Sequence, residues 1–85
     1  MPGRLEELRQ RIEQIAGDSS DLDCLYARAI AGLLSCAPYV DAPKRKEALA
    51  KAQDGIDRLV QRLGEDDQRV EILQEMYGLA ADEAP

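Results

Sequence analysis

The segment from Leu22 to Ala37 constrains the fold of this chain more than any other. It reads LDCLYARAIAGLLSCA and carries only two charged residues, Asp23 and Arg28. One row of its apolar side chains comprises Leu22, Tyr26, Ala29 and Leu33, and a second comprises Leu25, Ile30 and Leu34. A helix that is apolar on nearly every side is normally covered by neighbours. The rest of the chain, or a partner, must therefore supply helices to cover it.

The segment from Arg4 to Ala16 has the pattern of an amphipathic helix. Its apolar residues recur at steps of three, four and three, which places them on one face. This row comprises Leu5, Leu8, Ile12 and Ile15. Charged residues occupy the other sides, and Gly17 is the expected stop.

A third helix is predicted from Pro43 to Leu63. Asp41 is expected to cap it, and Pro43 lies at an early position where its missing N–H is tolerated. Its apolar row comprises Leu49, Ala52, Ile56, Leu59 and Leu63. Gly55 costs about 1 kcal/mol relative to alanine inside a helix, so we expect a bend or a close approach by another backbone there. Gly64 is the expected end.

A short fourth helix is predicted from Asp67 to Tyr77, with Gly78 as its stop. Residues 80–85 are expected to form a disordered tail, which leaves residues 1–79 as a single helical domain. The predicted fold class is all-α. We expect a small antiparallel helical bundle of three longer helices and a short fourth, completed by association.

Two connecting segments have recognisable turn chemistry. Ser19 or Ser20 is expected to cap the central helix, and Asp21 and Asp23 suit the positive end of its dipole. Between the second and third helices, Tyr39 and Val40 lie between two prolines and are expected to fold over the end of the bundle as a lid.

Composition excludes several classes of function. The 85 residues carry a net charge of −6 and no histidine, which argues against nucleic acid or an anionic membrane as partner and against a metal or other cofactor. Cys24 and Cys36 are twelve positions apart, about 18 Å along a helix, too far for a disulfide. Free thiols without an export signal indicate the cytoplasm, and the residue usage suits a bacterial or phage genome.

No pattern of catalytic residues is convincing, so we expect that the chain is not an enzyme. Asp18, Asp21 and Asp23 lack the spacing of a calcium loop, and capping explains them. Glu71 and Glu75 lie one turn apart without the histidine that di-iron bundles use. Cys24 would need a neighbour such as Arg28 to stabilise a thiolate, and ordinary packing explains it better.

One resemblance to a known family involves Gly17 to Leu22. The acidic composition, the short length and the stretch GDSS before a helix superficially resemble an acyl carrier protein, in which a serine at the start of the second helix carries a phosphopantetheine arm. The resemblance implies Ser19 or Ser20 as the attachment site. The family's D-S-L core is missing here, because Ser19 is followed by Ser20 and Asp21.

The apolar surface predicts a non-catalytic protein–protein interaction module. The predicted helices carry more apolar surface than so short a monomer can cover. We therefore expect self-association or docking of a partner helix. Such a module would be an adaptor, a chaperone-like protein or a regulatory subunit. The expected anchors are Leu25, Ile30, Leu33, Leu34, Ile56, Leu59 and Val60. An account in which the small residues of the central helix simply pack inside the bundle is also open.

A charged rim is expected to orient the partner. It comprises Lys44, Arg45, Lys46, Glu65, Asp66, Asp67, Glu71 and Glu75. The acidic members also allow an alternative, in which the chain is an acidic inhibitor that occupies a basic site on its target. Salt distinguishes the two, because binding between opposite charges weakens as ionic strength rises and apolar docking does not.

Overall fold

The computed structural model describes residues 3–17 and 21–82, and these residues form an all-α bundle without strands. The elements are α1 (Arg4–Ala16), α2 (Leu22–Cys36), the 3-10 turn η1 (Ala37–Tyr39), α3 (Ala42–Leu63) and α4 (Gln68–Asp82). The predicted class, a small all-α helical bundle, is confirmed.

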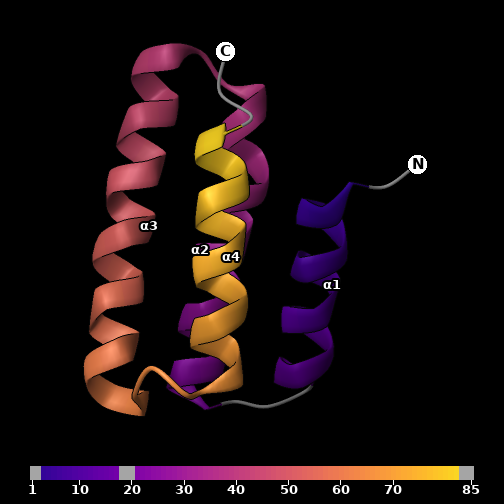
Figure 1. Ribbon diagram of the computed structural model, residues 1–85, viewed down its shortest axis with the longest axis vertical. Coiled ribbons are helices and arrows are strands. Elements are labelled where there is room, and N and C mark those ends of the chain that lie inside the picture. The colour runs from indigo at the N-terminus through magenta and orange to yellow at the C-terminus, as the bar shows by residue number, and fades with distance from the viewer. Residues whose placement is uncertain (1–2, 18–20, 83–85) are drawn as a thin grey trace.

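Successive helices run in opposite directions, so α2 and α4 are parallel to each other (Figure 1). These two helices contact each other across the middle of the bundle. The helices α1 and α3 each pack against both of them but not against each other. Residues of α2 and α4 therefore form the shared centre, with α1 and α3 at opposite sides.

Helix ends follow the expected turn chemistry. Gly17 and Gly64 end α1 and α3 with φ values of 52° and 88°, a region that glycine enters at little cost. Asp41 caps α3, and its Oδ1 accepts from the backbone N–H of Lys44 at 3.3 Å. For α2 the cap is Asp21, whose Oδ1 accepts from the N–H of Asp23 at 2.7 Å. The serines predicted for that role lie outside the described residues.

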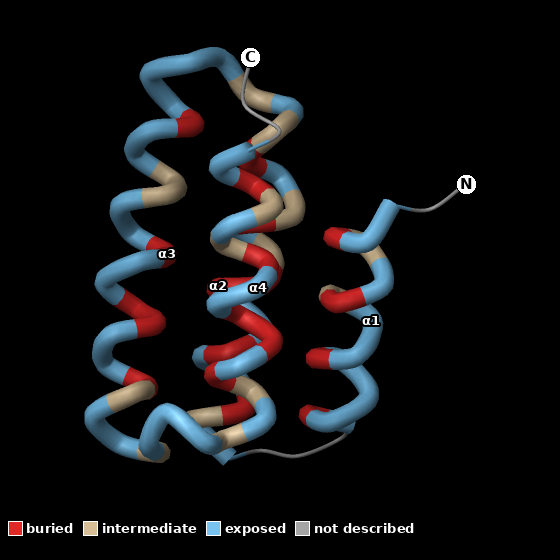
Figure 2. The backbone as a smooth tube through the Cα atoms, in the orientation of Figure 1, coloured by how far each residue is buried: buried red, intermediate tan, exposed pale blue. Residues whose placement is uncertain are grey.

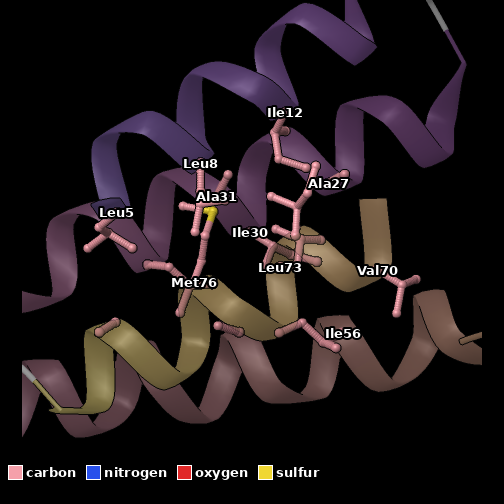
Figure 3. Packing of buried hydrophobic residues seen from close by; sticks show 14 of the residues in the cluster. Leu5, Leu8, Ile12, Ala27, Ile30, Ala31, Ile56, Val70, Leu73 and Met76 are labelled. Carbon is pink, nitrogen blue, oxygen red and sulfur yellow. The ribbon is translucent and has the colours of Figure 1, made fainter. Parts of the chain in front are cut away.

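The core lies along the inner faces of all four helices (Figure 2). Close-packed side chains from three helices meet in Figure 3, where Leu8 of α1, Ala31 of α2 and Met76 of α4 lie together. The largest fully buried side chains are Leu8, Ile12, Leu34, Ile56, Leu59, Leu73, Met76 and Val70. Burial of this apolar surface is the main stabilising contribution to the bundle.

The inner face of α1 differs from the prediction at its last turn. Ile15 is 37% exposed, whereas Ala16 is buried. With 3.6 residues per turn, position 16 lies nearer than position 15 to the row that contains Leu5 and Ile12. The prediction from steps of three and four residues, which assigned Ile15 rather than Ala16 to the core, is therefore wrong.

The last helix is longer than predicted. Gly78 does not stop α4, which continues to Asp82 and buries Ala80 completely. At 15 residues it equals α2, and α1 with 13 residues is the shortest helix. Contacts made by Ala80 in the core offset the cost of about 1 kcal/mol for a glycine inside a helix. The expected disordered tail is thus wrong for residues 80–82, and residues 83–85 lie outside the described part.

The connection between α2 and α3 is closed by an arginine rather than by a tyrosine lid. Tyr39 is 88% exposed, so it does not close the end of the bundle. Arg45, predicted as part of an exposed basic cluster, is buried. Its Nε donates to the carbonyl oxygen of Ala37 at 3.1 Å, and its Nη2 donates to that of Val40 at 2.9 Å. The guanidinium thus donates to two backbone carbonyls of the turn, of which that of Ala37 also accepts from the N–H of Val40 at 3.4 Å.

A candidate interaction face on α2

The second helix has two apolar faces, and only one of them is covered. Its inner face consists of Cys24, Ala27, Ile30, Ala31 and Leu34, all buried in the bundle. The opposite side, here called the outer face, consists of Leu22, Leu25, Tyr26, Ala29 and Leu33, with Cys36 at its end, all exposed. The steps between these residues place them on one side of the helix. Exposed apolar rows of this kind mark interaction sites.

An open groove of about 500 Å³ runs beside the outer face, between α2 and α3. Its apolar lining comes from Leu22, Leu25, Tyr26 and Ala29 of α2. Arg58 and Arg62 of α3 form the opposite wall. Leu22 is 77% exposed at one end, so a large apolar side chain has almost no cover within the described chain.

The charged groups beside the groove are already paired within the chain. Arg62 Nε lies 2.7 Å from Asp23 Oδ1 and Nη2 lies 3.4 Å from Oδ2, a two-point contact between α3 and the start of α2. Arg58 lies 3.3 Å from Asp54 one turn earlier. This hydrogen bonding raises the pKa of Arg62 above its ordinary value. With both arginines paired, the groove offers a partner mainly apolar surface.

The close packing of α3 against α2 depends on Gly55. A Cβ built on Gly55 would lie 2.7 Å from Cδ1 of Ile30 and 3.4 Å from the hydroxyl oxygen of Tyr26. The missing side chain admits Ile30 into the core and leaves Tyr26 at the surface beside α3. The close approach expected at Gly55 therefore occurs, but it involves side chains rather than another backbone.

The structure separates the seven predicted anchors into two groups. Leu25 and Leu33 are exposed on the outer face, and Val60 is half-buried. Ile30, Leu34, Ile56 and Leu59 are buried in the chain's own core, so their assignment as partner contacts is wrong. Leu22, Tyr26 and Ala29, which share a predicted apolar row with Leu33, are also exposed on the outer face.

The predicted charged rim is not one continuous surface. Lys44, Lys46, Glu65, Asp66 and Glu71 are exposed, whereas the buried Arg45 belongs to the turn. Glu75 pairs with Arg4 of α1 at 3.2 Å.

Asp67, another member of the predicted rim, belongs to the start of α4. Its carboxylate accepts from the backbone N–H of Arg69 at 2.9 Å and from the guanidinium of the same residue at 3.0 Å. These bonds hold the pKa of the Asp67 carboxyl below its ordinary value. Arg69 also donates through Nη1 to Sγ of Cys24, 3.3 Å away, which joins the first turns of α4 and α2.

Within residues 3–17 and 21–82, no group of three or more metal-binding side chains gathers, and no helix is both long and apolar enough to cross a membrane. Both cysteines are free, as their spacing predicted. Asp18 and the proposed attachment serines, Ser19 and Ser20, lie outside this part of the chain.

No protein-family model, curated protein or solved structure matches the chain.

Proposed function

We propose that this chain is a non-catalytic protein–protein interaction module that binds an apolar helix along the outer face of α2. The observation that carries the proposal is the exposed row from Leu22 to Leu33, on a helix whose opposite face already fills the core. Folding alone does not require apolar residues at these exposed positions, so binding is the better reason for them.

The proposed mechanism is burial of a helix in the groove between α2 and α3. Leu25, Tyr26 and Leu33 are the proposed anchors, because large side chains near the middle of an interface carry most of its binding energy. Arg28 is exposed and does not line the groove, so it is placed to influence orientation at the edge. An adaptor, a chaperone-like protein or a regulatory subunit of the cytoplasm would work in this way.

The alternative of an acidic inhibitor has less support. Asp67 and Glu75 would have to leave Arg69 and Arg4, with which they are paired, before they could bind a basic target. Binding by the outer face should respond little to salt, whereas an acidic inhibitor should lose affinity steeply as ionic strength rises.

Thiol labelling in host cells tests whether the outer face is covered. One exposed cysteine is introduced into a Cys36→Ser background, either at Leu25 (Leu25→Cys) or, as a control, at the exposed Gln74 of α4 (Gln74→Cys). The buried Cys24 serves as an internal reference. We expect alkylation at position 25 to be about tenfold slower in cells than in dilute purified protein, with position 74 unchanged. Equal rates at position 25 in cells and in dilute solution would contradict the proposal.

A further inference from the structure

We infer that the outer face of α2 binds the same face of a second copy of this chain, antiparallel, about a twofold axis near Ala29. The inference rests on the proposed function, because it names the occupant of the surface proposed there. Its support is the spacing and size of the outer-face residues, together with their lack of charge.

The outer-face residues are placed symmetrically about Ala29 in the sequence. Leu25 and Leu33 lie four positions before and after it, and Leu22 and Cys36 lie seven positions before and after it. In an antiparallel twofold pair, each residue meets its counterpart at the mirrored position. Leu25 of each copy therefore faces Leu33 of the other, and each Leu22 faces a Cys36.

The sizes of the side chains are complementary in this register. Tyr26 and Gly32 lie three positions on either side of Ala29, so each tyrosine comes to the level of a glycine at the half-buried edge of the other copy's outer face. A Cβ built on Gly32 would meet nothing within 4 Å, so the surface there has room for a ring. Ala29, at the crossing point, lets the two backbones come close. A parallel pair would instead oppose Tyr26 to Tyr26 and leave empty space between the two glycines.

The charge on this face also favours a second copy over a charged partner. Arg28 is the one charged residue among the exposed positions of α2 from 22 to 36. The arginines across the groove are paired with aspartates of their own chain. An acidic or basic partner would therefore find little to neutralise its charge, whereas an equally uncharged apolar face would be well matched. Although each chain carries a net charge of −6, the contacting faces are nearly uncharged, so association should respond little to salt.

The short length of the contact between the two α2 helices predicts a reversible dimer. A helix of 15 residues is about 22 Å long, which is short for an interface that buries the usual ~800 Å² on each partner. We expect a dissociation constant in the micromolar range.

Sedimentation velocity on the purified, reduced chain tests association, from about 1 µM to about 500 µM. We expect a monomer–dimer equilibrium that Leu33→Glu weakens by at least tenfold and that Gln74→Glu leaves unchanged. A monomer throughout would overturn the inference. The labelling experiment in cells then separates the two proposals: a covered Leu25→Cys thiol would leave the proposed function standing with another partner, and an uncovered one would overturn both.

Disulfide trapping tests the register, with oxidised glutathione as the acceptor of the two electrons and two protons released by each thiol pair. We expect Leu22→Cys to yield a covalent dimer through Cys36 of the other copy. The unmodified chain should yield none, because two Cys36 residues lie about 21 Å apart in the antiparallel pair. The control variant Leu22→Cys/Cys36→Ser should also yield none. A covalent dimer of the unmodified chain, or of that control, would show a parallel pair and overturn the inferred arrangement.

Discussion

Gly55 of α3 lies against Ile30 of α2 so closely that a Cβ at position 55 would come within 2.7 Å of Cδ1 and 3.0 Å of Cγ1. Ile30 is buried and cannot swing out into solvent. The contact thus fixes how closely α3 packs on α2, and with it the width of the groove beside the outer face.

Substitution of Gly55 and of Gly32 by alanine should have opposite effects on stability. Gly55→Ala gains up to about 1 kcal/mol of helix propensity, but crowding against Ile30 costs about 1–3 kcal/mol, so we expect net destabilisation. Gly32→Ala meets nothing within 4 Å and should stabilise the monomer by up to about 1 kcal/mol. Urea unfolding in dilute solution measures both. A stabilised Gly55→Ala variant would mean that the core yields easily at Ile30.

Adjacent leucines of α2 should differ sharply when truncated. Leu34 is completely buried, so Leu34→Ala should lower the free energy of unfolding by about 3 kcal/mol. Leu33 is 36% exposed, and Leu33→Ala should cost less than about 1 kcal/mol in dilute solution while it weakens association. Unfolding and sedimentation of the same samples give both quantities. Similar losses of stability in the two variants would contradict the assignment of inner and outer faces.

Removal of the Arg45 guanidinium should destabilise the fold although the residue belongs to a basic cluster. Arg45→Met keeps an apolar stem but removes the side-chain donor of the Val40 carbonyl and leaves the Ala37 carbonyl with only the N–H of Val40 at 3.4 Å, at a cost of about 2 kcal/mol. The exposed neighbour provides the control, because Lys46→Met should change stability by less than about 0.5 kcal/mol. Thermal unfolding should show a clear loss of stability for Arg45→Met and almost none for Lys46→Met. Equal effects would place Arg45 at the surface.

The Asp67–Arg69 pair should make stability depend on pH in the acid range. The folded-state pKa of Asp67 lies below its ordinary value of 3.8, so the stability it contributes is present above pH 3.8 and is lost as pH falls through the folded-state pKa. Asp67→Asn keeps a cap for α4 but removes the charge, and we expect it to cost about 1 kcal/mol at pH 7.

The native chain and Asp67→Asn are compared at each pH because Asp67 is not the only carboxylate with a lowered pKa. Arg9 also lowers the pKa of Glu6, and that contribution is the same in both proteins. The difference in unfolding free energy between the native chain and Asp67→Asn should shrink as pH falls below 3.8. A difference that stays constant with pH would show that the charge of Asp67 is not its cause.

The all-α fold class and most helix ends could be predicted from residues close together in the sequence. The bounds of the first helix, the Asp41 cap and the glycine stops before residue 65 depend on neighbours in the sequence, and they agree with the structure. The cap of α2 is Asp21 rather than one of the predicted serines. Gly78 shows the limit of such reasoning. Burial of Ala80 keeps the last helix intact, and that contact depends on helices packed against it rather than on its own sequence.

The exposed apolar face could be predicted for α2, but its residues could not. Leu33 and Leu34 are neighbours of the same type, and the apolar pattern of α2 is too broad to show which side meets the bundle. The positions of α1, α3 and α4 decide it. The burial of Arg45 was equally hidden, because its partners are backbone carbonyls that become available only when the 3-10 turn forms.

The division of α2 into an inner and an outer face means that folding and the proposed recognition are encoded at different positions of one helix. Substitutions at Leu25, Ala29 or Leu33 change few contacts that hold the bundle together, so such changes can accumulate without loss of the fold. Descendants of one ancestral gene could acquire separate partners by drift on this side alone. The same property makes the bundle a suitable scaffold for engineered binding, with a small library confined to the exposed positions of a single helix.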